Sequence, residues 1–299
     1  IQGCFFRGNY GNCVWSHLYG FAVLHSDLRV IDNSFTDNGL DCIQFGGVVG
    51  GAAIGNRFRR TGYIPNNRSA DIGPTNLSVP RWDATDGYYA VALDTSGIVK
   101  GVSYANNTFI STNGGDIDAD GFCDGSITGN VCFTPRSAAQ NGTADPEYVT
   151  DSIATSGPAN NGVTWSYGCQ PSDTYGLTFG SRNINISGNV FINKDGGAIK
   201  LIGTQGCSVT GNNIVSYLQT SGAATSMAPI ILYNFNDSSG TKRTAHNNVV
   251  YDNVINWLIS SQWSAIIEYG ADLGQPAFDS GDKNWVHGNQ LLSSYLTEF

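Results

Sequence analysis

A short unit built around an asparagine recurs along this chain: usually Gly or Asp, then Asn, any residue, and an apolar residue. The repeated asparagines are Asn33, Asn56, Asn107, Asn130, Asn189, Asn212, Asn253 and Asn289. Their separations are 23, 51, 23, 59, 23, 41 and 36 residues, so three equal 23 and the others equal 23 plus an insertion. A 23-residue return is typical of one coil of a three-stranded solenoid. We therefore predict an all-β, right-handed parallel β-helix of about 23-residue coils.

The repeated asparagine belongs at a turn, because its side chain tolerates the left-handed conformation and bonds to neighbouring amides. Stacked coils then form an asparagine ladder. The apolar residue two positions later should point into the solenoid, which predicts an inward column of Phe35, Phe58, Phe109, Phe191, Ile214 and Ile255. The alternative, a β-sandwich with Asn-rich turns, does not account for an equal interval between identical turns.

A second strand is predicted in each coil, eight to ten residues after the ladder asparagine or after an insertion. Alternation places one outward column at Gln44, Ala92, Asp118, Thr178, Lys200 and Glu268, and a neighbouring one at Gly46, Asp94, Asp120 and Gly180. This alignment puts Asp41 on the opposite side of the strand. A one-residue slip would turn every side chain over.

The chain is predicted to be one domain, residues 1–299, with insertions at 64–88, 135–174, 217–227 and 270–281. The first three follow a ladder strand at one corner, and long loops in a regular fold often carry function. The first two would flank the coil that starts at Asn107. They are rich in aromatic residues, of which Trp82, Tyr88, Trp165 and Tyr167 are the candidate substrate-binding rings. Such rings suit stacking on sugars, although they could instead pack the loops onto the solenoid.

The segment Asp116-Ile117-Asp118-Ala119-Asp120-Gly121 has the highest density of acidic residues in the chain. It resembles the start of a calcium loop, but the twelfth position is Ile127 where a bidentate Glu belongs. On a strand, its three carboxylates would point outward together, and repulsion makes this costly unless the site uses them. No cofactor is predicted, although this strand could bind Ca²⁺. A solvated acidic surface is the alternative.

Asp94 is predicted to lie one coil away from Asp120, at about the strand spacing of 5 Å. That separation is close to the one expected for the two carboxyl groups of a retaining glycosidase. The candidate catalytic residues are therefore Asp94, Asp118 and Asp120, with Glu268 in reserve across a subunit boundary. Asp116 and Lys200 are candidate substrate-binding residues.

Composition limits the possible partners. The formal net charge is −9, which disfavours nucleic acid and anionic membranes, and no apolar run is long enough to span a bilayer. The seven cysteines are odd in number and lack metal-binding spacing, so they favour neither a disulfide framework nor a zinc site. The chain begins inside a repeat, and we expect it to be a processed or trimmed piece.

The coil pattern over about residues 1–292 resembles the pectin-lyase-like superfamily of parallel β-helices, and its long loops and low charge resemble bacteriophage tailspike depolymerases. The resemblance implies an enzyme that cleaves a bacterial surface or extracellular polysaccharide, a homotrimer, and a place in a virion tail or outside the cell. Asp120-Gly121-Phe122 resembles a motif of alginate epimerases, but Cys123-Asp124 replaces their Pro-His. The polygalacturonase signatures are not found. Glycoside hydrolase is therefore the first hypothesis; polysaccharide lyase, epimerase, a non-catalytic carbohydrate-binding or adhesin β-helix, and a structural spacer stay open.

Overall fold

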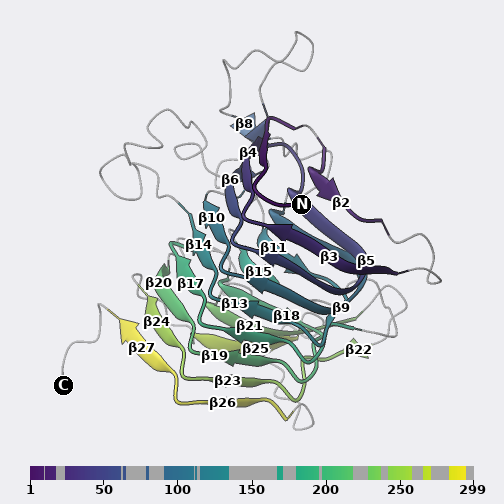
Figure 1. Ribbon diagram of the computed structural model, residues 1–299. Coiled ribbons are helices and arrows are strands. Elements are labelled where there is room, and N and C mark those ends of the chain that lie inside the picture. Colours follow the sequence, from purple (N-terminus) through teal and green to yellow (C-terminus); the bar gives the residue numbers. More distant parts are fainter. Residues whose placement is uncertain are drawn as a thin grey trace.

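The computed structural model describes residues 1–9, 11–17, 24–61, 63–64, 79–80, 91–110, 112, 115–134, 167–170, 180–194, 197–217, 228–236, 242–257, 265–270 and 283–293. All regular structure in these ranges is β-strand (Figure 1). Almost every pair of neighbouring strands is parallel; the two short exceptions are β7 (Tyr63–Ile64) with β8 (Val79–Pro80), and β21 (Ile230–Asn236) with β22 (Lys242–Arg243). The described residues contain no helix suited to crossing a membrane.

The first face of the solenoid, which we call the ladder sheet, has nine strands. In order they are β1 (Phe5–Arg7), β4 (Ser34–Asn38), β6 (Arg57–Thr61), β10 (Thr108–Ile110), β14 (Val131–Phe133), β17 (Val190–Ile192), β20 (Asn213–Tyr217), β24 (Val254–Trp257) and β27 (Gln290–Ser293). Every one of these strands except β1, which follows Cys4, begins just after a ladder asparagine, and each pairs with its equivalent in the next coil. The chain therefore forms a parallel β-helix, as the repeat predicted.

The remaining strands form a second and a third face. The second face holds β2 (Val14–Trp15), β11 (Gly115–Ala119), β15 (Tyr167–Gln170), β18 (Ile199–Ile202), β21 and β25 (Ile266–Gly270), and the third holds β3 (His25–Ile31), β13 (Ser126–Thr128), β16 (Asn185–Ser187), β19 (Ser208–Thr210), β23 (Val249–Tyr251) and β26 (Trp285–His287). Two long strands, β5 (Ile43–Ile54) and β9 (Leu93–Ala105), run through both faces and join them into one sheet. The short β12 (Phe122–Cys123) pairs with the middle of β9.

The asparagine ladder is confirmed at all eight positions. From Asn56 onward, the Oδ1 of each ladder asparagine accepts hydrogen bonds from the backbone N–H and the side-chain Nδ2 of the ladder asparagine one coil earlier, and Asn33 Oδ1 accepts from the backbone N–H of Cys4. The residue in the left-handed conformation is the one before the asparagine, such as Asp32 (φ 54°) or Gly129 (φ 65°). Gly and Asp recur at that position because they tolerate a positive φ.

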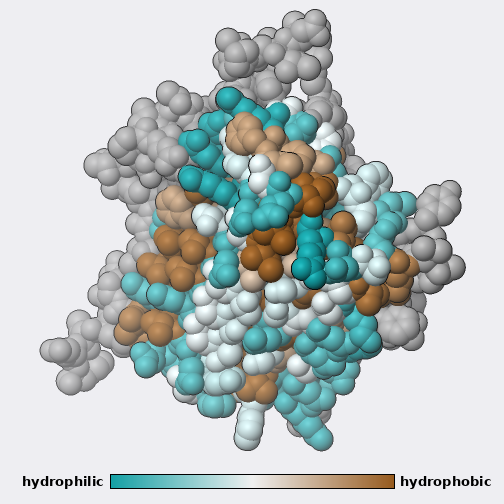
Figure 2. Space-filling model, viewed as in Figure 1, coloured by the Kyte–Doolittle hydropathy of each residue, from teal (hydrophilic) through white to brown (hydrophobic). Residues whose placement is uncertain are grey.

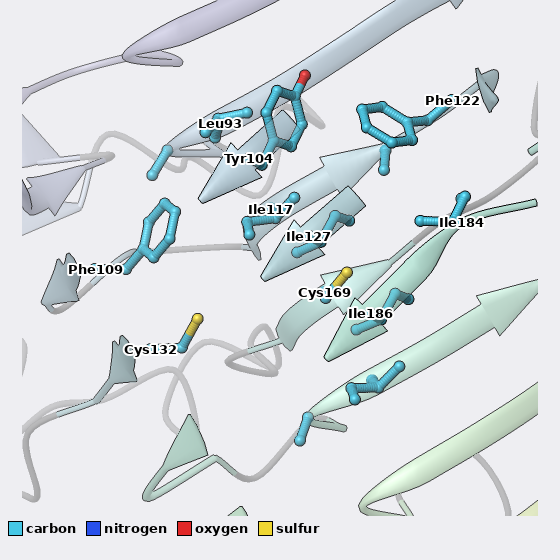
Figure 3. Packing of buried hydrophobic residues seen from close by; sticks show 14 of the residues in the cluster. Leu93, Tyr104, Phe109, Ile117, Phe122, Ile127, Cys132, Cys169, Ile184 and Ile186 are labelled. Carbon is cyan, nitrogen blue, oxygen red and sulfur yellow. The ribbon is translucent and has the colours of Figure 1, made fainter. Parts of the chain in front are cut away.

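The predicted inward column is also confirmed. Phe35, Phe58, Phe109, Phe191, Ile214 and Ile255 are each at most 1% exposed. The rings of Phe35, Phe58 and Phe109 stack with centroids 4.8–5.0 Å apart, which is the strand spacing. Figure 3 shows Phe109 and Cys132 of the ladder sheet pointing toward Ile117 and Cys169 of the second face, so the faces close on a common apolar core.

A second regular turn separates the second and third faces, and the sequence analysis missed it. Its positive-φ residues are Asp27, Gly50, Gly101, Asp124, Asn183, Gly206, Asn247 and Lys283. Each lies six residues before a ladder asparagine. The segment from this turn to the next ladder asparagine therefore has the same length in every coil. Differences in coil length arise in the rest of the coil.

In the chain, residues 64–88 and 217–227 follow a ladder-sheet strand and precede β9 and β21 of the second face, whereas 135–174 follows β14 but includes β15 of the second face. Most of their residues lie outside the described part of the chain. Residues 270–281, also mostly outside it, fall instead between β25 and β26. The second-face strand after β14 is β15 (Tyr167–Gln170), inside the predicted insertion 135–174, and the strand predicted at 176–180 falls almost wholly outside the described residues.

Candidate functional site

The acidic residues of the second face lie on adjacent strands in direct register. Asp94 of β9 is opposite Asp118 of β11, Gln44 of β5 is opposite Asp94, and Trp15 of β2 is opposite Gln44. On the other side Asp118 is opposite Gln170 of β15, and Lys200 of β18 follows Ile199, which pairs with Cys169. We call this outward line of side chains, from Trp15 to Lys200, the acid column.

The predicted pairing of Asp94 with Asp120 is wrong by two residues. Leu93 pairs with Ile117 and Thr95 with Ala119, whereas the prediction aligned Val91 with Ile117. Strand alternation has a period of two, so a two-residue shift leaves every residue on its predicted side and the apolar pattern does not detect it. The correction pairs Asp94 directly with Asp118.

A line of hydrogen bonds holds the Asp94 carboxylate. Asn12 Nδ2 donates to Gln44 Oε1 at 2.9 Å, which fixes the orientation of the Gln44 amide, and Gln44 Nε2 donates to Asp94 Oδ2 at 2.5 Å. A donor at this distance favours the ionised form of the carboxyl group. Gln44 therefore positions Asp94 and partly offsets the cost of its charge.

The pKa values of Asp94 and Asp118 are both raised well above the ordinary range. For Asp118 the largest cause is burial, followed by the nearby carboxylates of Asp120 and Asp94. For Asp94 the largest cause is also burial, followed by the charge of Asp41, while the Gln44 hydrogen bond lowers the pKa. Two such groups side by side share protons, so one can remain protonated while the other is ionised.

Asp41 is a member of this cluster that the sequence analysis placed on the opposite side. Its Oδ1 accepts a hydrogen bond from the backbone N–H of Val91 at 2.8 Å, one coil on. Its charge raises the pKa of both Asp94 and Asp118. Asp41 precedes β5 and lies at the corner of the solenoid, where strand alternation does not predict side-chain direction.

A tight turn after β11 positions Asp120. Thr95 Oγ1 donates to the backbone oxygen of Asp120 at 2.8 Å, and Gly121 follows with φ 66°. A Cβ on Gly121 would lie 1.9 Å from the carbonyl oxygen of Gly97, so only glycine allows the turn to approach the neighbouring coil. Asp120 is 7% exposed and lies close enough to raise the pKa of Asp118.

The outward orientation expected for Asp116 is wrong. Its side chain is fully buried and forms an ion pair with Lys194, which is itself 1% exposed and donates to Thr134 Oγ1 at 3.0 Å. Lys194 comes from the loop after β17, 78 residues away, and a sequence pattern gives no indication of such a partner. A buried pair of this kind supports the coil and is closed to a ligand.

Lys200 lies at the other end of the acid column from Trp15. Burial lowers the pKa of its ammonium group to about 8, and the negative charge of Asp118 opposes that shift. Its Nζ lies 5.0 Å from the ring centroid of Tyr233. Glu268 does not join this column: it pairs with Leu232, which pairs with Leu201, so its predicted place in the Asp118 column is wrong.

Three of the predicted substrate-binding rings, Trp82, Tyr88 and Trp165, lie outside the described residues. Tyr167 lies on β15 in register with Gly115. Trp15 is an aromatic residue of the site that the sequence analysis missed; it is 60% exposed and its ring meets the His17 ring edge-on at 5.0 Å. The sequence could have indicated Trp15, because it follows the apolar Val14 at the start of the second strand of the first coil and alternation then places it outward.

Within the described ranges, no group of three or more His, Cys, Asp and Glu side chains is placed to hold a metal ion. Of the three carboxylates of the acidic strand, Asp116 pairs with Lys194. Calcium binding by this strand stays a prediction.

Comparison with known proteins gives only distant similarities. No family model and no curated protein sequence matches the chain. Among solved structures, it is similar to the surface adhesin PfbA of Streptococcus pneumoniae in two structures (TM-scores 0.48 and 0.39, 13% and 12% identity). It is also similar to the A-module of the mannuronan C-5 epimerase AlgE4 of Azotobacter vinelandii (TM-score 0.36, 13% identity). Each match covers 90% of this chain, but only 61% and 66% of the adhesin chains and 71% of the epimerase module.

Proposed function

We propose that this chain is a polysaccharide-degrading enzyme and that the acid column is its active site. The observation that carries the proposal is the pairing of Asp94 with Asp118 on adjacent strands, both with raised pKa values. Like-charged groups in register destabilise a sheet. Their place on the outward side, next to two further carboxyl groups, favours a chemical role over a solvated acidic surface.

The reaction that suits this pair is hydrolysis of a glycosidic bond. Asp118, which burial and Asp120 keep protonated, donates its proton to the leaving glycosidic oxygen. Asp94, stabilised as the anion by Gln44, attacks the anomeric carbon as the C–O bond breaks. Water then releases the sugar, and Asp118 accepts a proton from that water. Adjacent strands lie about 5 Å apart, which suits a retaining mechanism.

The other members of the column bind and position substrate in this proposal. Trp15 offers an exposed ring for stacking on a sugar at one end, and Lys200 offers a donor at the other. Asp41 and Asp120 are positioning residues, since they act through the pKa values of the working pair. The resemblance to tailspike depolymerases supports a bacterial surface or extracellular polysaccharide as substrate, a virion-tail or extracellular location, and a homotrimer.

A lyase or epimerase is the second candidate, and Lys200 is the observation that favours it. With a pKa of about 8, its amine is neutral in a useful fraction of molecules under mildly alkaline conditions and can accept a proton from a sugar carbon. A non-catalytic binding module remains the third candidate, and it requires only the exposed ring and the polar column.

The test is turnover on a panel of bacterial and extracellular polysaccharides, measured by release of reducing ends and by the ultraviolet absorbance of unsaturated products. Asp118→Asn should lower kcat at least about a hundredfold, the low end for general acid catalysis. Asp252→Asn is the matched control, because Asp252 is exposed at a turn with φ 55°, which Asn also tolerates.

The two assays separate the hydrolase from the lyase, whereas an epimerase gives neither signal. Reducing ends without absorbance support hydrolysis, and absorbance that is lost in Lys200→Ala supports the lyase. Full activity in Asp118→Asn and Asp94→Asn would exclude the acid column as the active site. Sugar binding without turnover by the wild type would favour the binding module.

A further inference from the structure

The third face is the most regular surface of the molecule. Because every strand there spans the same six residues between two turns, its outward side chains form two straight columns. One column includes Ser103, Ser126, Asn185 and Ser208, and the other includes Thr128, Ser187 and Thr210. In Figure 2, pale side chains of intermediate hydropathy gather in rows on this side of the solenoid.

In the four coils from Ser103 to Thr210, six of the eight column positions carry a hydroxyl group, and the strands place them at a fixed spacing of about 4.8 Å. Ser126 Oγ donates to Ser103 Oγ at 3.1 Å, so hydroxyl groups of neighbouring coils are close enough to contact the same ligand group. Each hydroxyl can both donate and accept a hydrogen bond. Between Ser103 and Thr210 these positions hold no Asp, Glu, Lys or Arg, although the whole chain carries a net charge of −9. Toward the N-terminus the first column continues through Ala52 to Arg29, which forms an ion pair with Asp27.

Both columns lead to a group of rings at the C-terminal end of the face, of which Trp285 and His287 are exposed and Tyr251 is half-buried; Val249 separates Ser208 from Trp285 in the first column. Tyr251 and His287 continue the second column and stack with centroids 5.4 Å apart. Trp285 continues the first column, is 70% exposed, and meets the His287 ring edge-on at 5.9 Å. Burying such large apolar faces would stabilise a complex, and their geometry is fixed by the strands before a ligand arrives.

From this juxtaposition of an aromatic platform with an uncharged hydroxyl strip, we propose that the third face binds a neutral polysaccharide chain laid across the strands. Trp285, with Tyr251 and His287 beside it, stacks on sugar rings, and the hydroxyl columns bond to the sugar hydroxyls beyond. An anionic polysaccharide is the poorer occupant, because the hydroxyl positions hold no cation, Arg29 at the far end of the first column is paired with Asp27, and the protein is acidic overall. This surface is separate from the acid column, which lies on the second face, and does not depend on the chemistry proposed there.

Native affinity electrophoresis tests the proposal. The full chain is run through gels that contain neutral polysaccharides (dextran, galactomannan, xylan) or acidic ones (alginate, polygalacturonate, hyaluronate). We expect retardation by at least one neutral polysaccharide, with little dependence on salt because no ion pair contributes. Trp285→Ala should weaken binding about tenfold or more, the loss of one stacking platform. Phe5→Ala is the matched control, because Phe5 is an exposed ring (65%) on the ladder sheet.

A second variant covers the case in which Trp285→Ala unfolds the last coil. Thr210→Lys places a long charged chain in the middle of the strip and should also abolish retardation, while the melting temperature stays near that of the wild type. Three results would each overturn the proposal. They are unchanged retardation in both variants, no retardation of the wild type by any neutral polysaccharide, and salt-sensitive retardation by acidic polysaccharides alone. Loss of self-association in Trp285→Ala without an effect on glycan binding would assign the platform to a second copy of the chain and would also overturn it. Turnover measured in parallel keeps this result distinguishable from failure of the active-site proposal.

Discussion

Replacing Asn107 by alanine tests the ladder at its centre. The Asn107 side chain is fully buried and takes part in four hydrogen bonds. Its Oδ1 accepts from the backbone N–H of Asn56 at 2.9 Å and from Asn56 Nδ2 at 3.1 Å. Its Nδ2 donates to Asn130 Oδ1 at 3.0 Å and to Ala53 O at 2.9 Å. The ladder thus loses both a donor and an acceptor in one coil.

The expected cost follows from the groups left behind. Asn130 Oδ1 still accepts from the backbone N–H of residue 107, so it remains satisfied. Two buried donors lose their acceptor: the backbone N–H of Asn56 and one N–H of its Nδ2, whose other N–H keeps Val30 O. The carbonyl of Ala53, which lies within the β5–β9 pairing, loses one donor. At about 1–3 kcal/mol for each orphaned donor, Asn107→Ala should lower the free energy of unfolding by about 2–6 kcal/mol.

The measurement is an equilibrium urea titration followed by far-ultraviolet circular dichroism and tryptophan fluorescence. Asn213→Ala is the control, because Asn213 is an exposed asparagine that directly follows another ladder position. Its stability should change by no more than about 0.5 kcal/mol. If the midpoint of Asn107→Ala moved no further than that of Asn213→Ala, the ladder would not be a main source of stability.

Three further predictions follow from the core and the charged groups. Phe109→Ala, which removes a fully buried ring from the stack, should cost about 3–5 kcal/mol in the same titration, and a neutral result would contradict the inward column. Asp116→Ala leaves the Lys194 ammonium buried without its counter-ion and should cost about 3–5 kcal/mol, whereas a surface-like change would show that solvent reaches the pair. Because the folded-state pKa of Asp118 is raised, the folded protein binds protons more tightly than the unfolded one, so stability should fall as pH rises from about 4 through the raised pKa. Asp118→Asn should flatten that slope in thermal melts across pH, and an identical slope in the wild type and the variant would contradict the assigned shift.

Much of the fold is readable from the sequence because it depends on local geometry repeated at a fixed interval. The residue before each ladder asparagine must take a positive φ, the asparagine must bond to its neighbour, and the residue two positions on must point inward. The third face was equally readable, since segments such as Ser126-Ile127-Thr128-Gly129-Asn130 recur with their turn six residues before the asparagine. It was missed because the predicted strands were those after each asparagine and not those before it.

The acid column depended on the tertiary structure. The sequence identified Asp94 and Asp118 as outward carboxylates, but alternation with a period of two cannot distinguish registers that differ by two residues. The backbone pairing between coils sets the register in which Asp94 lies opposite Asp118, with Gln44 and Trp15 on the next two strands of the same line. The ion pair between Asp116 and Lys194 likewise appears only in the folded structure. The coils differ in length, so the number of residues between such partners is not a multiple of the repeat. Periodicity determined which side chains face outward, and the contacts between coils decided which of them meet.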